Sequence, residues 1–138
     1  MQNKVANSIG LFFLLLALVT LFDNPVIGQN GYFYADFSQN LIHLITGVSI
    51  IVVAEKFYYL YPKLLRFWGA FYLSFAVLGS VLVGYSRYGH MLEVITVNGQ
   101  DHILHMILGL ILITLGTSSV RMPLSAEDNS DYHLDIHS

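Results

Sequence analysis

Four long apolar stretches, almost free of charged side chains, constrain the fold of this chain more than any other feature of its sequence. We expect helices at about residues 5–22, 38–55, 64–85 and 101–120. Helices of ~18–22 apolar residues are long enough to cross the hydrocarbon core of a bilayer. Only 11% of the residues are charged, whereas a soluble domain has about 25%. The sequence therefore predicts an all-α integral membrane protein, a four-helix bundle.

We expect this bundle to occupy residues 1–124 and to be followed by an acidic cytoplasmic tail at residues 125–138. The first stretch also fits a secretory signal peptide, with Val26-Ile27-Gly28 as a cleavage site made of small residues. A retained first helix is the interpretation that we favour.

The second and fourth stretches open with the same pattern, 62 residues apart. A polar residue precedes a histidine by three positions and a glycine follows the histidine by four: Asn40, His43 and Gly47 in one copy, His102, His105 and Gly109 in the other. On a helix these positions share one face. Each copy therefore predicts a helix face that carries a polar group, an imidazole and a small residue.

The first and third stretches resemble each other more weakly. Gly10-Leu-Phe-Phe-Leu is similar to Gly69-Ala-Phe-Tyr-Leu. Together the two likenesses predict a pair of duplicated helical hairpins related by a pseudo-twofold axis along the membrane normal. Under that symmetry His43 and His105 are equivalent and face each other across the bundle.

The basic residues indicate how the helices are oriented. Five of them fall at the ends that a cytoplasmic N-terminus would place inside: Lys4, Lys56, Lys63, Arg66 and Arg121. Only Arg87 falls outside, so the positive-inside rule places both termini in the cytoplasm. We expect a multi-pass protein of a bacterial inner membrane, with both histidine patterns near the outer leaflet.

Small and polar residues suggest how the helices begin and pack. Ser38 or Asn40 can cap the second helix, and Asp101 can cap the fourth. Ala76, Ser80 and Gly84 form a stripe of small residues on the third helix. Such stripes let helix backbones approach closely in membranes, so we expect packing inside the bundle, with a homo-oligomer contact as the alternative.

The sequence resembles a family of small bacterial four-span membrane proteins known as domain of unknown function 4383. The likeness rests on Asn40-x-x-His43-Leu44-x-x-Gly47 and on Val97-Asn98-x-x-Asp101-x-x-Leu104-His105-x-x-x-Gly109. It extends over about residues 37–116. His102 departs from the family pattern, which usually has an aromatic or aliphatic residue, next to an asparagine, at that position. The resemblance implies a four-helix membrane fold and supplies no activity.

The two repeated histidines allow three interpretations. In the first, they are neutral imidazoles hydrogen-bonded across helices, with Asn40, Asp101, Thr46 or Gln100 as partners. In the second, His43 and His105 are the axial ligands of a haem b, or one of them binds a chlorophyll, with Gly47 and Gly109 making room for the macrocycle.

The third interpretation is a metal site at the outer face. Asp101, His102 and His105 lie within about one helical turn, and His90 and Glu93 in the preceding loop could fold over them. Imidazole and carboxylate together suit zinc or copper.

No catalytic motif is evident in the sequence. The chain has no cysteine, and it lacks a nucleophile elbow, a P-loop and a dinucleotide fingerprint. No basic patch suggests nucleic acid, and the spans lack the mid-membrane charges of a coupled transporter. We therefore expect a non-catalytic accessory or structural subunit that contacts the lipid bilayer and packs against other membrane proteins or its own copies. A haem- or pigment-binding protein that uses the histidine pair is the alternative.

Overall fold

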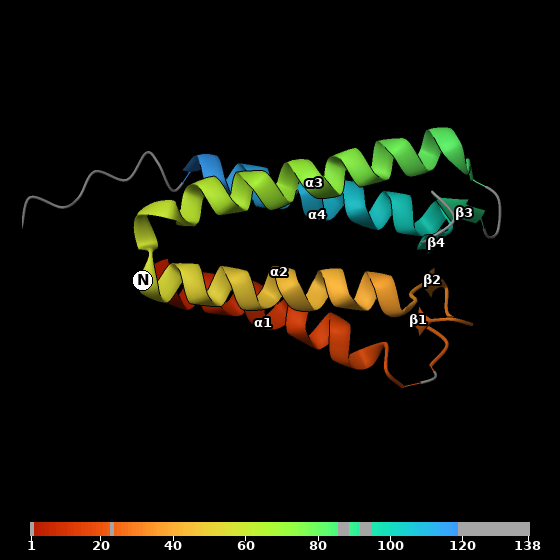
Figure 1. The fold of residues 1–138 in the computed structure, drawn as a ribbon, viewed down its shortest axis with the longest axis horizontal. Coiled ribbons are helices and arrows are strands. Elements are labelled where there is room, and N and C mark those ends of the chain that lie inside the picture. Colours follow the sequence, from red (N-terminus) through yellow and green to blue (C-terminus); the bar gives the residue numbers. More distant parts are fainter. Residues whose placement is uncertain (1, 23, 86–88, 92–94, 119–138) are drawn as a thin grey trace, which may run out of the picture.

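Four long helices run side by side in the computed structural model, with two short pairs of strands at one end (Figure 1). The structure describes residues 2–22, 24–85, 89–91 and 95–118. The helices are α1 (Gln2–Val19), α2 (Phe37–Lys56), α3 (Tyr61–Leu82) and α4 (Gly99–Ser118), with a 3₁₀ turn, η1 (Tyr58–Leu60), between α2 and α3. The expected all-α class is confirmed.

Three of these helical segments are long and apolar enough to cross a membrane: Phe37–Lys56, Tyr58–Leu82 and Gly99–Ser118. The apolar segment Lys4–Val19 in α1 is shorter. Leu, Val, Ile and Phe side chains are exposed along the outside of all four helices. A soluble monomer rarely exposes such a continuous apolar surface, so the helices indicate a membrane protein.

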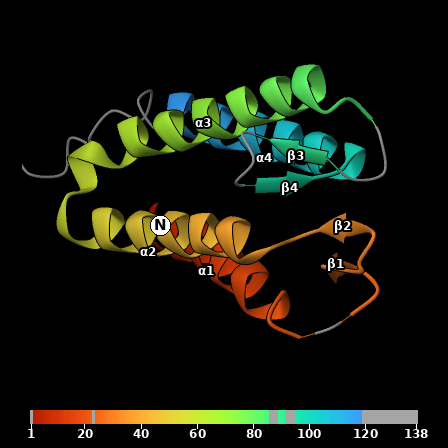
Figure 2. The ribbon, with the colours of Figure 1, turned by 45° about the vertical axis from the view of Figure 1, so that its right-hand side comes forward.

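The helices pair as two hairpins, α1 with α2 and α3 with α4 (Figures 1 and 2). In the first hairpin, Gly10 and Gly47 bring the two backbones into contact. A Cβ atom at Gly47 would lie 2.8 Å from the carbonyl oxygen of Gly10. In the second, a Cβ atom at Gly69 would lie 2.8 Å from the carbonyl oxygen of Gly109. Neither crossing has room for a larger side chain.

This packing differs from the expected stripe on α3. Ala76 is fully buried, but Ser80 is only half-buried and its hydroxyl donates to the carbonyl oxygen of Ala76. Gly84 lies beyond the end of α3, in a turn with φ of +71°. The close approach in this hairpin therefore depends on Gly69 of α3, seven positions (about two helical turns) before Ala76, and on Gly109 of α4.

The helix starts also differ from the sequence expectation. Asp36 caps α2, because its carboxylate accepts a hydrogen bond of 3.0 Å from the backbone N–H of Gln39; the expected caps Ser38 and Asn40 were wrong. The Asn98 side chain accepts from the N–H of Asp101 at 2.9 Å, while the Asp101 carboxylate accepts from the N–H of Asn98 at 2.8 Å. This reciprocal pair is a capping box, in which Asp101 is the third residue of α4 rather than its cap.

Short strands replace the loops expected at this end of the molecule. β1 (Ile27–Gly28) pairs in parallel with β2 (Phe33–Tyr34), and β3 (Gly89–Met91) pairs antiparallel with β4 (Ile95–Val97). Figure 2 shows β1 and β2 beyond the N-terminal end of α2, and β3 and β4 beside the N-terminal part of α4. The predicted roles of Arg87, Glu93, Arg121 and the acidic tail fall outside the described residues.

Burial follows the sequence repeat. Each buried residue of α2 has a buried counterpart 62 positions later in α4: Gln39, His43, Thr46, Gly47, Ile50 and Ala54 correspond to Asp101, His105, Leu108, Gly109, Leu112 and Gly116. In α1 and α3 the spacing is 59, and Ala6, Gly10, Phe13 and Ala17 correspond to Leu65, Gly69, Tyr72 and Ala76. The two hairpins thus bury the same faces of their helices.

Candidate functional site: a histidine–aromatic cluster between the hairpins

Four rings, one from each helix, meet where the two hairpins contact each other. They are Phe13 of α1, His43 of α2, Tyr72 of α3 and His105 of α4, which we call the central cluster. Phe13 and Tyr72 are stacked with ring centres 5.5 Å apart. Both rings follow a repeated glycine by three positions, so the repeat itself pointed to them, although sequence reasoning singled out only the histidines.

The structure brings the two repeated histidines together. The centres of their rings are 6.2 Å apart and the rings are tilted by 50°. Both side chains are almost completely buried, with exposed fractions of 5% for His43 and 4% for His105. The Tyr72 ring stacks against both imidazoles, at 6.1 Å from His43 and 5.5 Å from His105.

A hydrogen bond between hydroxyl groups fixes the Tyr72 ring. The Thr46 hydroxyl lies 3.2 Å from the Tyr72 hydroxyl and donates its one proton to the carbonyl oxygen of Ile42, at 2.8 Å. Since the proton of Thr46 is used in this way, Tyr72 must be the donor in the bond between the two side chains. This bond links α3 to α2 across the hairpin boundary.

Polar partners are missing on one side of each imidazole. The Nδ1 atoms of His43 and His105 are buried and have no hydrogen-bond partner. Leaving a buried polar atom without a partner costs about 1–3 kcal/mol. The buried histidine pair therefore lowers the stability of the fold unless its Nδ1 atoms gain a partner.

Two of the residues expected to bond to these histidines, Asn40 and Asp101, bond elsewhere. Asn40 pairs with the Thr20 hydroxyl. The Asp101 carboxylate accepts from the backbone N–H groups of Tyr34 and Asn98. Among the described hydrogen bonds, neither residue reaches a histidine ring.

A small cavity of about 10 Å³ adjoins both imidazoles. Its walls are the side chains of Gln39, Ile42, His43, Phe71, Tyr72, Phe75 and His105. This volume accommodates about one water molecule, so the cavity has no room for a porphyrin or a chlorophyll ring.

The repeated glycines do not make room for a macrocycle either. The space beside Gly47 is filled by Gly10 and Leu14, and the space beside Gly109 is filled by Gly69 and Leu73. These glycines serve the contact within each hairpin. The pair of histidines therefore does not fit the haem or chlorophyll of the second sequence interpretation.

The side chains of the three residues expected to form an outer metal site each contact a different part of the molecule. The Asp101 carboxylate is used by the cap of α4. The His102 ring packs on Gly79, and its Nε2 donates to the carbonyl oxygen of Gly84 at 3.2 Å. His105 faces the central cluster instead. Within the described residues, no three histidine, cysteine or carboxylate side chains gather into a metal site.

The loops contribute a second network at the N-terminal ends of α2 and α4. The backbone N–H of Thr96 donates to the Asp36 carboxylate at 3.1 Å, and the Gln39 amide donates to the carbonyl oxygen of Thr96 at 2.8 Å. Conversely, the N–H of Tyr34, in the loop of the first hairpin, donates to the carboxylate of Asp101 in α4 at 2.9 Å. Each hairpin therefore holds the loop of the other one through the first residues of α2 and α4. His90, once expected near a metal, bonds to Thr96 in this region.

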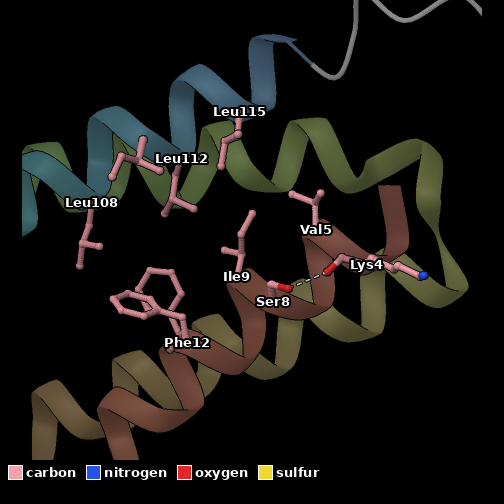
Figure 3. Close-up of a pocket in the computed structure, with 10 residues that line it drawn as sticks. Lys4, Val5, Ser8, Ile9, Phe12, Leu108, Leu112 and Leu115 are labelled. Atoms are coloured by element: carbon pink, nitrogen blue, oxygen red, sulfur yellow. Dashed lines mark hydrogen bonds between the residues drawn. The ribbon is translucent and has the colours of Figure 1, made fainter. Parts of the chain in front are cut away.

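An apolar groove of about 460 Å³ opens between α1 and α4 (Figure 3). Its lining consists of Lys4, Val5, Ser8, Ile9, Phe12, Phe13, Leu108, Ile111, Leu112 and Leu115. In Figure 3, Ile9 and Phe12 from α1 point toward the leucines of α4 across this space. The hairpins are in contact at the central cluster and separate along this groove.

Comparison with known proteins gives no relative: no family model, curated protein or solved structure matches the chain. The resemblance to domain of unknown function 4383 stays a prediction.

Proposed function

We propose that this chain is a four-span integral membrane protein of a bacterial inner membrane, with both termini in the cytoplasm, and that it acts as a non-catalytic accessory subunit. The exposed apolar side chains on all four helices support insertion in a bilayer. Lys4, Lys56, Lys63 and Arg66 lie at the helix ends opposite the strands, which supports a cytoplasmic location for that end.

Counting α1 as a span is supported by its packing. α1 runs beside α2 (Figure 1), and their backbones meet at Gly10 and Gly47. A span that is slightly short for the bilayer is accommodated by local thinning, at a modest cost. The equivalent burial in α1 and α3 supports a pseudo-twofold axis that relates the hairpins.

The groove between α1 and α4 is the observation that supports the role of an accessory subunit most directly. We place there a transmembrane helix of another membrane protein. The groove is lined almost entirely by apolar side chains and lies between two hairpins that are closely packed internally. Since lipid chains are as apolar as these walls, a partner helix gains from shape and packing rather than from burial of apolar surface.

Site-specific photo-crosslinking in membranes of the native host tests this proposal. Probes at Phe12 and Ile111 lie in the groove, while a probe at Val81 lies on the outer face of α3, where the side chain is 76% exposed. We expect one discrete protein adduct from both groove positions and none from Val81. Filling the groove with Ser8→Trp should abolish that adduct.

Two outcomes would contradict the accessory role. One is a groove probe that yields only lipid adducts while the protein purifies as a monomer. The other is an adduct that is equally strong from Val81 and unaffected by Ser8→Trp. Such an adduct would show that the partner contacts the protein without occupying the groove.

A further inference from the structure

We infer that the cavity between His43 and His105 holds a single copper(I) ion, coordinated by one nitrogen from each imidazole. This inference is independent of the accessory role, because it concerns the central cluster and not the groove. It rests on the unpartnered ring nitrogens, the spacing of the rings, and the charge and walls of the cavity.

The ring nitrogens are the first observation. The two imidazoles are at least nine-tenths buried, they line one cavity, and each has an Nδ1 atom with no hydrogen-bond partner. A neutral imidazole has one nitrogen with a free lone pair, and that lone pair is a ligand for a transition metal. Both histidines therefore line the same small space, and each has a ring nitrogen that no hydrogen bond uses.

The spacing of the rings is the second observation. A metal ion that lies about 2 Å from a nitrogen of each of two opposed imidazoles sets their ring centres roughly 6–6.5 Å apart. The observed separation is 6.2 Å. The cavity of about 10 Å³ is large enough for one ion and too small for an ion with a shell of waters.

Charge and coordination number select the ion. Gln39, Tyr72 and the two histidines are the polar side chains of the cavity wall, and none of them is a carboxylate or a thiolate. A buried ion there would keep its full charge, and the cost of burying a charge rises with its square, so a monovalent ion is strongly favoured over a divalent one. Zinc would also need about four ligands. Imidazole suits copper, and copper(I) accepts two opposed nitrogen ligands.

The aromatic side chains in the cavity wall also favour a bound cation. Phe71, Tyr72 and Phe75 line the cavity. Aromatic ring faces attract cations, and Tyr72 is held in place by its bond to Thr46. Gln39 lies toward the outer loops, where its amide nitrogen is bound to the carbonyl oxygen of Thr96.

The test uses the full chain, purified in detergent and titrated with copper(I) under anaerobic, reducing conditions against a chromophoric copper(I) chelator. We expect one equivalent to bind. His43→Gln and His105→Gln should each weaken the affinity by at least about 100-fold, since they remove one of two ligands. His102→Gln is the matched control, because His102 is also a buried histidine with an unpartnered Nδ1 but lies against Gly79. It should bind copper like the wild type.

X-ray absorption at the copper edge of the wild type provides a readout that needs no variant. We expect two nitrogen neighbours at about 2 Å and no sulfur neighbour. The inference is overturned by a protein that takes up no copper(I), which would make the cavity a water site. It is equally overturned by coordination through methionine sulfur, or by affinity that is unchanged in both histidine variants. Tighter binding of zinc than of copper(I) would overturn the assignment of a monovalent ion.

Discussion

The hydroxyl of Tyr72 lies 3.2 Å from the hydroxyl of Thr46, and this bond joins the two hairpins at the centre of the bundle. The corresponding positions in the other halves of the repeat are Phe13 and Leu108, which have no hydroxyl. Each hairpin thus contributes one hydroxyl to this pair, Thr46 from α2 and Tyr72 from α3, while the equivalent pair of positions in α1 and α4 has none. The two hairpins differ from each other at both of these positions, and the two hydroxyl groups that result are bonded to each other across the hairpin boundary.

Removing this bond should loosen the contact between hairpins. We expect Tyr72→Phe and Thr46→Val each to lower the free energy of unfolding by about 1 kcal/mol, in the range of interhelical hydrogen bonds in membranes. A double-mutant cycle in denaturant titrations should give a coupling of roughly 0.5–1.5 kcal/mol, because the two side chains share one bond. Strict additivity of the two changes would show that the bond contributes nothing.

The reverse substitution is the matched control. Phe13→Tyr adds a hydroxyl at the corresponding position, where Leu108 offers no partner, and burial of that group costs about 1–3 kcal/mol. The same hydroxyl is therefore stabilising in α3 and destabilising in α1. A neutral effect of Phe13→Tyr would indicate that the added group reaches the groove beside it.

The glycine crossings should be intolerant of any side chain. Gly47→Ala and Gly109→Ala each place a Cβ atom 2.8 Å from a backbone carbonyl oxygen of the neighbouring helix. Because the obstacle is backbone, the helices must separate, and overpacking of this kind costs about 1–3 kcal/mol. We expect both variants to lose stability by similar amounts in thermal or denaturant unfolding.

Ser80→Ala is the control for the glycine variants, because Ser80 lies on α3 but makes only a bond to its own helix. It should change the stability by less than about 0.5 kcal/mol. If Ser80→Ala were as damaging as Gly109→Ala, the loss of stability would not be specific to the glycine crossings.

The sequence alone predicted the helices and the relation of the two histidines, because both depend on spacing along the chain. A repeat of 62 residues places equal side chains at equal depth whenever both copies are helical and run in the same direction. The partners of the histidines depend on side-chain rotamers. Asn40 and Asp101 lie one turn from His43 and His105, yet they bond to Thr20 and Tyr34.

The helix starts show a second limit. Asp36, Ser38 and Asn40 are all residue types that cap helices, and only the path of the chain decides among them. Asp36 prevails because its carboxylate also accepts the N–H of Thr96, which lies 60 residues away. The strands of two or three residues in the loops are too short to leave a periodic pattern.

The contacts between loops and helix starts should control the dynamics of the end of the molecule that carries the strands. We expect Asp101→Ala to speed amide hydrogen exchange at Tyr34 and Asn98, since both N–H groups lose their acceptor. Asp36→Ala should do the same at Gln39 and Thr96. Exchange in the middle of α2 and α4 should change little, because those helices are held by the hairpin contacts. Uniformly faster exchange over the whole chain would mean that these carboxylates support the global fold instead.

The orientation in the membrane can be measured with single cysteines, since the chain has none of its own. Asn30 lies exposed in the loop beside β2, and Tyr59 lies in η1 at the opposite end, 64% exposed. The basic residues near η1 favour the cytoplasm for that end. We therefore expect a membrane-impermeant maleimide to label Asn30→Cys in intact spheroplasts and to label Tyr59→Cys only after the membrane is opened. The opposite pattern would reverse the topology. Labelling of both sites in intact spheroplasts would mean that the chain does not cross the membrane.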